Sequence, residues 1–405
     1  MSTKKIVLEY DVVIIGAGIV GLAIARALGT TSPSLKVLII DKESAVGLHA
    51  SGRNSGVLHA GFYYSPDSLK AQFCREGNLA MRKLAEKYGV TVNPIGKVVV
   101  AKNHQELERM NILYERGLAN QVEMKLLSES SLHDYEPFAV THKSFLWSPT
   151  TAIVDKDGIM QAMLNELKEL KVDLVFKEKF LSNSNRQVVT TNYTVKYRHL
   201  VNASGSGAIA IAHKLGFGYK FSMIPFLGVY RATAHANLPL RTLVYPVPHP
   251  ENPFLGTHFT ITTDGLVKIG PTAQPIMFSE QYEFTHGWNL EELRKSTTAM
   301  SMYFGNNVAD VSKLIATELP QLLEHQLVKK SSELVPLARE VSAWKRKPAG
   351  IRAQLLKIDS KKLEQDFVVE GDADSTHLLN IVSPGWTSSI PFANWIVEKY
   401  VIPNL

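Results

Sequence analysis

Three glycines near the N-terminus have the spacing of a loop that holds a diphosphate. Gly16, Gly18 and Gly21 follow a short apolar run and precede a stretch with helical character. The first permits a tight strand-to-helix turn, the second lets the backbone approach a pyrophosphate, and the third lets the helix pack closely on a sheet. The diphosphate would lie on free amide N–H groups at the positive end of that helix.

An acidic residue stands where the partner of this loop is expected. The apolar run 36–40 ends in Asp41, whose carboxylate can accept hydrogen bonds from the ribose hydroxyls of adenosine. Strand, glycines, helix, strand and acid occur in that order, which a structural turn alone does not explain. The chain is therefore expected to bind an adenine dinucleotide, and these residues suit NAD as well as FAD.

A second loop rich in glycine and serine follows at residues 49–64, HASGRNSGVLHAGFYY. Its Ser-Gly and Ala-Gly pairs can press the backbone against a planar ring or a phosphate. A cofactor that carries only nicotinamide has no evident need of such a loop here. This segment therefore favours a flavin dinucleotide.

Apolar spacing predicts the elements that must position these residues. Helices are predicted at 19–28, 67–88, 104–119, 156–170 and 391–400, and over 289–329 with a break at Pro320. Strands are predicted at 11–15, 36–40, 97–101, 174–180, 188–195 and 200–201. Residues 221–273 are rich in β-formers and predict an antiparallel sheet, with PFLGVYRATA, RTLVYPVP, THFTITT and GLVKIGP as its strands.

The order of these elements predicts an α/β (α+β) fold, with a Rossmann-type dinucleotide-binding domain interrupted by an inserted antiparallel-sheet substrate domain. The discontinuous dinucleotide-binding domain is assigned residues 1–90, 145–220 and 345–405. The substrate or cap domain is assigned residues 91–144 and 221–344.

Composition excludes several classes of function. With Cys74 as its single cysteine, the chain cannot form an internal disulfide or a multi-cysteine metal site, and no metal is expected. The net charge is +6, but the basic residues are scattered, so nucleic-acid binding is not expected. No signal peptide fits before Tyr10, and no apolar run is long enough to span a membrane. The expected location is cytoplasmic, and peripheral contact with the inner face of a membrane stays open.

Together, the glycine fingerprint and the loop 49–64 resemble the flavoproteins of the D-amino-acid-oxidase and glycerol-3-phosphate-dehydrogenase superfamily. The most specific resemblance is to the L-2-hydroxyglutarate dehydrogenase/oxidase family. It is carried by three segments spread over the chain: GRNSGVLHAGFYYSPDSLKAQFCREGN (52–78), VYPVPHPENPFLGTHFTITTDGLVKIGP (244–271) and PAGIRAQ (348–354). The resemblance implies a glutathione-reductase-like fold of the D-amino-acid-oxidase (DAO) type with FAD as cofactor.

The resemblance also implies which residues hold the FAD. One group would bind the ADP half, a second would line the pyrophosphate and flavin, and segments near Ala203 and the C-terminus would close over the ring. These cofactor-binding residues are Gly16, Gly18, Gly21, Asp41, Lys42, Ser51, Arg53, Asn54, Ser55, Gly56, Ala203, Ser204, Gly205, Gly350, Gly385, Thr387 and Ser388.

The implied reaction is oxidation of an L-2-hydroxy acid, first L-2-hydroxyglutarate to 2-oxoglutarate, with hydride transfer from C2 to flavin N5. A neutral histidine suits the task of accepting the hydroxyl proton at physiological pH. The candidates are His59, in the loop 49–64 (the flavin loop), and His258, in the GTHFT segment. The sequence leaves open which of them is the base, and whether His59 links covalently to the flavin.

The carboxylate of the substrate requires a guanidinium, whose planar fork matches two oxygens. Arg352 is the candidate, because the GIRAQ segment is expected to return to the flavin edge. Aromatic residues are expected to complete the substrate site, either as hydroxyl donors or as apolar walls. They are Tyr63, Tyr64, Tyr230 and Trp386.

The chain departs from the family pattern at two places near the expected substrate. An Arg-Gly-Glu-Tyr pattern of the family reads Leu-Gly-Val-Tyr at 227–230 here, and strand alternation would turn Arg231 away from Tyr230. The usual SPAATS reads SPGWTSS, which places Trp386 near the flavin. A five-carbon diacid should need a second cation, so these changes bear on the substrate.

Two alternative functions and the identity of the electron acceptor stay open. The donor could be an amino acid, a secondary amine or glycerol 3-phosphate, within the same superfamily. A different class of function is a non-catalytic, flavin-bound partner protein. The electron acceptor could be oxygen, a quinone or an electron-transfer protein.

Overall fold

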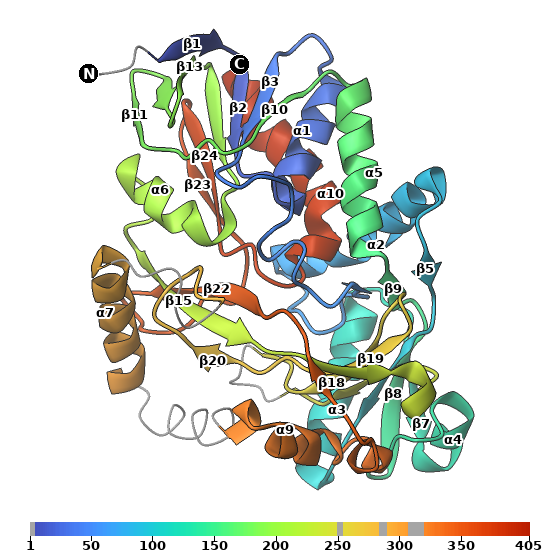
Figure 1. Ribbon diagram of the computed structural model, residues 1–405. Coiled ribbons are helices and arrows are strands. Elements are labelled where there is room, and N and C mark those ends of the chain that lie inside the picture. Colours follow the sequence, from blue (N-terminus) through green and yellow to red (C-terminus); the bar gives the residue numbers. More distant parts are fainter. Residues whose placement is uncertain (1–4, 249–253, 283–289, 307–319) are drawn as a thin grey trace.

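A mostly parallel sheet, built from both the N-terminal and the C-terminal parts of the chain, lies in the upper half of Figure 1. The computed structural model describes residues 5–248, 254–282, 290–306 and 320–405. In spatial order the six strands are β10 (Asp173–Val175), β3 (Val37–Ile40), β2 (Val12–Ile15), β14 (His199–Asn202), β24 (Ser375–Leu379) and β23 (Val368–Gly371). The first five run parallel, and β23 is antiparallel to β24.

Both faces of this sheet are covered, which is why its central strands are apolar throughout. On one face, Val12 and Ile14 pack among the helices α1 (Ile19–Thr31), α2 (Leu69–Tyr88), α5 (Lys156–Glu169) and α10 (Gly385–Ile396). On the other face, Val13 and Ile15 pack against a small sheet, whose strands in order are β1 (Ile6–Glu9), β13 (Tyr193–Lys196), β12 (Gln187–Val189) and β11 (Ser182–Ser184). Helix α6 (Ala208–Lys214) lies beside β24.

An eight-stranded sheet forms the second region, in the lower part of Figure 1. Its order is β21 (Lys345–Arg346), β16 (Arg231–Ala234), β19 (Leu266–Gly270), β18 (His258–Ile261), β17 (Leu243–Pro246), β6 (Lys97–Val100), β8 (Ser144–Ser148) and β7 (Lys125–Ser128). Only the pair β6–β17 is parallel among these strands. Side chains of α3 (His104–Ala119), α4 (Leu132–Tyr135) and α9 (Glu324–Ser331) complete its core.

A long antiparallel pair connects the two regions. Strand β15 (Phe221–Gly228) pairs along its whole length with β22 (Gly350–Lys357), and β20 (Gln274–Pro275) lies on its other side. Helix α7 (Leu290–Asn306) packs on β15. The short strands β4 (Val57–Leu58), β9 (Ala152–Val154) and β5 (Val92–Asn93) form a small sheet of their own. None of the helices in the described ranges is long and apolar enough to cross a membrane.

The predicted fold class, a Rossmann-type domain with an inserted sheet, is confirmed, but several elements differ. Within 174–180 only the first two residues belong to a strand, and 188–195 is divided by the turn between β12 and β13. The segment PFLGVYRATA is divided too, because β15 and β16 join different sheets on either side of Val229–Tyr230. The predicted helix over 289–329 includes residues 307–319, which lie outside the described residues.

The C-terminal helix begins six residues earlier than predicted. Proline is rare inside helices, so Pro391 was expected at a helix start, yet α10 begins at Gly385 and contains it. Pro391 has no N–H to offer the carbonyl of Thr387. That carbonyl instead lies against Gly77 of α2, where an added Cβ would be 2.2 Å from its oxygen. Helices α2 and α10 therefore pack closely at the position where the proline interrupts the helical hydrogen bonds.

The domain division stays a prediction. Strand β8 belongs to the eight-stranded sheet although most of it lies beyond the predicted boundary at residue 144. Strand β22 pairs with β15 although the two were assigned to different domains. The antiparallel pair thus couples the two regions directly.

Candidate active site

One continuous cavity of about 1220 Å³ runs from the turn after β2 to the space between β22 and the eight-stranded sheet. Ligand sites often lie between such regions of a protein, and this volume exceeds that of most small-molecule pockets. Gly16 and Asp41 line one end, and Arg352 and His258 line the other. The cavity therefore brings together the predicted dinucleotide and substrate residues.

At the dinucleotide end, the turn after β2 is packed so closely that only glycine fits at two of its positions. Gly16 has a φ of +110°, and a Cβ there would lie 2.5 Å from the carbonyl oxygen of Ala203. A Cβ at Gly21 would lie 1.9 Å from the carbonyl oxygen of Gly16, so helix α1 packs directly on the turn. Gly21 itself does not line the cavity and instead supports Gly16.

Two side chains organise the backbone around this turn. The Asp41 carboxylate accepts a hydrogen bond from the Ala17 N–H at 2.6 Å. The Ser51 hydroxyl accepts one from the Ile19 N–H at 3.0 Å, at the start of α1. These two bonds fix the turn and the start of α1, and Gly18, Ile19 and Val20 line the cavity there beside Asp41.

The loop that follows is folded by its own polar side chains. Asn54 accepts a hydrogen bond from the Gly56 N–H at 2.8 Å and donates to the Ser51 carbonyl at 2.6 Å. Arg53 donates to the Ala349 carbonyl at 3.2 Å and lies 3.9 Å from the ring centroid of Tyr282. Of these predicted residues, Gly56 does not line the cavity.

The remaining predicted cofactor residues come from distant segments. Those that line the cavity are Lys42, Ser55, Ala203, Ser204, Gly205, Gly350, Gly385 and Thr387. Ser388 does not, since it is fully buried in α10. Thr387 links α10 to the flavin loop, because its hydroxyl accepts from the His59 N–H and donates to the Val57 carbonyl, each at 3.3 Å.

Both candidate histidines are buried and line the far end of the cavity. The Nδ1 atom of His258 lies 2.8 Å from the Gly256 carbonyl oxygen, which can only accept, so Nδ1 carries the hydrogen and Nε2 keeps its lone pair. Burial lowers the pKa of His258 to about 3, although the Gly256 bond opposes this. Burial, then the charges of Lys97 and His258, lower the pKa of His59 well below its usual value. Both rings are therefore neutral near pH 7 and can accept a proton.

Arg352 is the half-buried cation of this end. Its Nε donates to the side-chain oxygen of Gln354 at 2.8 Å, and its guanidinium lies 5.1 Å from the ring centroid of Phe254. Burial lowers the pKa of Arg352 to about 10, so the guanidinium still carries its charge at neutral pH. None of the described carboxylates forms an ion pair with it. A cation without a counter-ion at such a site is suited to bind an anion.

The four predicted aromatic residues also line the cavity. The buried hydroxyl of Tyr63 and the indole N–H of Trp386 have no hydrogen-bond partner among the described residues. Burial raises the pKa of both Tyr64 and Tyr230, while hydrogen bonds to Ser383 and Ser55, respectively, oppose the shift. Arg231, in contrast, pairs with Glu324 and the Trp344 carbonyl outside the cavity, as strand alternation predicted.

The sequence did not single out Lys97. This side chain is fully buried, and its ammonium has no hydrogen-bond partner in the described part of the chain. It lies 4.0 Å from the ring centroid of Tyr245, 5.1 Å from Tyr63 and 5.5 Å from Phe62. Burial lowers the pKa of Lys97 to about 7. Its one sequence signal was a lysine at the start of the apolar strand KVVVA.

Tyr245 stands between Lys97 and the histidine. Tyr245 pairs with Val99 across β6–β17, and its neighbour Val244 pairs with Phe259 across β17–β18, so Lys97, Tyr245 and His258 share one face of the sheet. The rings of Tyr245 and His258 stack with centroids 3.8 Å apart. Three successive strands therefore present ammonium, phenol and imidazole side by side.

Comparison with known proteins finds a matching family and relatives over nearly the whole chain. Residues 11–399 match the family model for FAD dependent oxidoreductases, DAO. The L-2-hydroxyglutarate dehydrogenase of Escherichia coli (strain K12) is 33% identical over 399 residues, which cover 96% of this chain and 93% of that protein. The mitochondrial L-2-hydroxyglutarate dehydrogenase of Mus musculus is 32% identical over 413 residues, covering 95% and 87%.

A solved structure shows the same fold. The dithionite-reduced L-α-glycerophosphate oxidase from Mycoplasma pneumoniae, with FAD bound, superimposes with a TM-score of 0.75 at 22% identity. The match covers 96% of this chain and 94% of that one. The two proteins therefore share their architecture from end to end.

Proposed function

The chain belongs to the DAO family of FAD-dependent oxidoreductases, and from this membership we propose that it oxidises L-2-hydroxyglutarate to 2-oxoglutarate. It is an FAD-dependent enzyme, and the relatives named above carry the substrate in their names. The observation that carries the proposal is that one cavity holds Arg352, a guanidinium without a counter-ion among the described residues, together with two neutral buried histidines.

The residues of the cavity fit FAD. The turn at Gly16 admits no side chain, and with Gly18 and Ile19 at the start of α1 it lines the cavity and would form a backbone cradle for the diphosphate. The cavity is continuous from this cradle to His258, as an extended dinucleotide requires. Trp386, whose buried indole N–H has no partner among the described residues, lines the same cavity. The predicted cofactor residues, including Asp41 and Lys42, are proposed to hold the dinucleotide.

When bound, FAD supplies the acceptor for the hydride that leaves C2 of the substrate. Arg352 binds the carboxylate next to C2 through its forked N–H groups and so orients the C2–H bond. The neutral Nε2 of His258 accepts the hydroxyl proton as the carbonyl forms, and its hydrogen bond to Gly256 keeps that nitrogen free. His59 lies in the flavin loop and is the second candidate for this proton.

Aromatic side chains complete the proposed substrate site. Tyr63, Tyr64, Tyr230 and Trp386 enclose it and exclude water, which strengthens the attraction between Arg352 and a carboxylate. Oxygen, a quinone or an electron-transfer protein would then reoxidise the flavin.

The test is anaerobic titration of the purified yellow protein. L-2-hydroxyglutarate should bleach the flavin absorption band, whereas glycine, L-proline and glycerol 3-phosphate should leave it unchanged. Bleaching by an amine or by glycerol 3-phosphate, but not by the hydroxy acid, would reassign the substrate. Absence of bleaching by every donor would favour a flavin-bound partner protein.

A further inference from the structure

A second cation, Lys70, lines the same cavity as Arg352. It stands in the first turn of α2, and only 4% of the residue is exposed. Lys70 belongs to the buried face of the helix, because Cys74, Gly77 and Met81 follow at helical spacing and are buried as well. A lysine in an apolar stripe buries a charge at a cost that packing alone does not offset.

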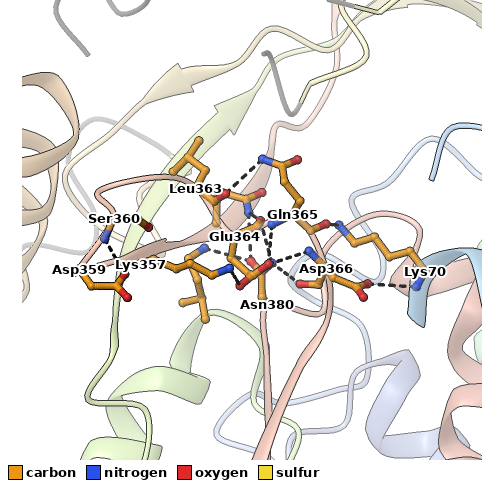
Figure 2. Close-up of polar contacts among 11 residues, drawn as sticks. Lys70, Lys357, Asp359, Ser360, Leu363, Glu364, Gln365, Asp366 and Asn380 are labelled. Atoms are coloured by element: carbon orange, nitrogen blue, oxygen red, sulfur yellow. Dashed lines mark hydrogen bonds and ion pairs between the residues drawn. The ribbon is translucent and has the colours of Figure 1, made fainter. Parts of the chain in front are cut away.

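The ammonium of Lys70 is held in one place (Figure 2). Its Nζ donates a hydrogen bond to the carbonyl of Gln365, its one hydrogen bond among the described residues. It lies 5.6 Å from the ring centroid of Phe367 and 6.0 Å from that of Tyr64. An ammonium carries three donors, so donors remain for a ligand.

The backbone around Lys70 is fixed independently of its side chain. The Asp366 carboxylate accepts hydrogen bonds from the N–H groups of Leu69 and Lys70 at 2.8 and 3.1 Å. Asn380 donates to the carbonyls of Glu364 and Asp366 at 3.1 and 2.7 Å, which ties this loop to the sheet (Figure 2). Removing the ammonium would therefore leave the start of α2 in place.

The same loop also positions Arg352. Gln354, which accepts from the Arg352 Nε, donates to the Glu364 carbonyl and to Asn380. Arg352 and Lys70 are thus mounted on one rigid network, with Tyr64 beside both. Two like charges in one cavity repel each other, and an anion bound between them would relieve that repulsion.

Resting on the proposed function, we propose that Lys70 binds the distal carboxylate of a dicarboxylic substrate while Arg352 binds the carboxylate next to the reacting carbon. Lys70 thereby selects a diacid over a monoacid of similar length. It fills the need for a second cation that the sequence leaves open where Leu227 replaces the family's arginine.

The charges around Lys70 predict how this selection depends on pH. Burial, then the charge of Arg352, lower the pKa of Lys70 to about 7, while Asp366 and Glu364 raise it. A bound carboxylate favours the ammonium, so diacid binding is tight below pH 7 and weakens as the pH rises above it. Monoacid binding, which uses Arg352 alone, should stay constant over the same range because the pKa of Arg352 is about 10.

The test compares binding of glutarate and butyrate to the oxidised holoenzyme, followed by the perturbation of the flavin spectrum. Lys70→Met should weaken glutarate binding about 30- to 100-fold, the effect of removing one member of a buried charge pair. Butyrate binding should change less than about twofold by the same argument. Lys70→Arg, which keeps a cation, should recover most of the glutarate affinity.

Lys83→Met is the matched control, since Lys83 is exposed on the same helix and should alter neither ligand. Equal losses for glutarate and butyrate in Lys70→Met, or no loss for either, would overturn the proposal. If Lys70→Met fails to hold FAD, the pH dependence of the unmodified enzyme decides. Glutarate affinity must then fall above pH 7 while butyrate affinity does not, and parallel curves would overturn the proposal.

These readouts are separate from turnover. An enzyme that discriminates glutarate from butyrate through Lys70, yet is not reduced by L-2-hydroxyglutarate, contradicts the proposed reaction but keeps the diacid site. An enzyme that L-2-hydroxyglutarate reduces, but whose preference for diacids survives in Lys70→Met, keeps the reaction and contradicts the role of Lys70.

Discussion

The two ends of the cavity differ in the chemical groups that line them. The dinucleotide end consists mainly of backbone and small side chains, whose polar groups have partners: Asp41 with Ala17, and Ser51 with Ile19. At the substrate end, buried polar atoms of His59, Tyr63 and Lys97 have none among the described residues. In the proposed function, the first end would hold the dinucleotide through its backbone, and the unpartnered groups of the second would act on the substrate.

This difference has an energetic consequence. A buried polar group without a partner costs about 1–3 kcal/mol, and such groups gather over the eight-stranded sheet. The apolar cores under that sheet and around α1 must offset this cost. Mutations at the dinucleotide end should therefore impair cofactor binding and folding, whereas mutations at the substrate end should impair catalysis and often leave folding intact.

The sharpest test of this contrast is Arg352→Met. Loss of the guanidinium should lower kcat/KM for L-2-hydroxyglutarate by about 10³-fold, as expected for a charged hydrogen-bonding group in a desolvated site. FAD content and melting temperature should stay close to those of the parent protein. Arg346→Met, on the exposed strand β21, is the control and should retain activity. A variant of Arg352 with near-normal kinetics would remove this residue from the substrate site.

The opposite end is tested by Gly16→Ala. A methyl group would collide with the Ala203 carbonyl at a residue whose φ is +110°, so FAD affinity should fall about 100-fold and the protein should lose about 2–3 kcal/mol of stability. Titration of the apoprotein with FAD and thermal unfolding measure the two effects. Gly305→Ala, in open space on α7, should leave FAD affinity unchanged and should not lower stability. Unchanged FAD affinity in Gly16→Ala would contradict the cradle.

A smaller effect is expected from Lys97→Met. The ammonium of Lys97 lowers the pKa of both histidines, although burial is the larger cause. Without it the base should stay protonated to a higher pH, so the acidic limb of the kcat/KM profile should move upward by about one pH unit. Lys97→Arg keeps the charge and should keep the limb in place. An unchanged pH profile in Lys97→Met would show that burial alone lowers the pKa of the base.

The smallest effect is expected from Arg231→Ala. Its guanidinium pairs with Glu324 at a partly exposed position outside the cavity. Surface ion pairs contribute about 0–1 kcal/mol, so kcat/KM should change less than about twofold and stability only slightly. A large rise in KM would mean that Arg231 contacts the substrate. That would contradict the assignment of Arg352 to the substrate site and of Arg231 to the surface.

The same contrast explains what could be predicted from the sequence. The Gly16 turn, α1 and Asp41 lie within one short segment, so local spacing was enough to identify them. Lys97 and Lys70 could be recognised as site residues only in the folded chain. Lys97 reaches the site because three strands pair side by side, and Lys70 because helix α2 packs on a distant loop. Each carried one signal, a lysine within an apolar pattern, which local spacing alone could not distinguish from a solvated side chain.

Long-range packing also decided the elements that were mispredicted. The break at Val229–Tyr230 occurs where the chain passes from one sheet to another, and α10 continues through Pro391 where it packs closely on Gly77 of α2. His59, His258 and Arg352 were found through a family resemblance, and the fold brings all three to one cavity. Their roles in the reaction stay predictions.

The most direct test of the central claim is rapid mixing of the oxidised enzyme with L-2-hydroxyglutarate in the absence of oxygen. The flavin should be reduced in one phase, more slowly when C2 carries deuterium, and the D-enantiomer should not reduce it. Such a result requires that the C2–H bond breaks as the flavin is reduced. Failure of L-2-hydroxyglutarate to reduce the flavin, or equal rates for both enantiomers, would contradict the account.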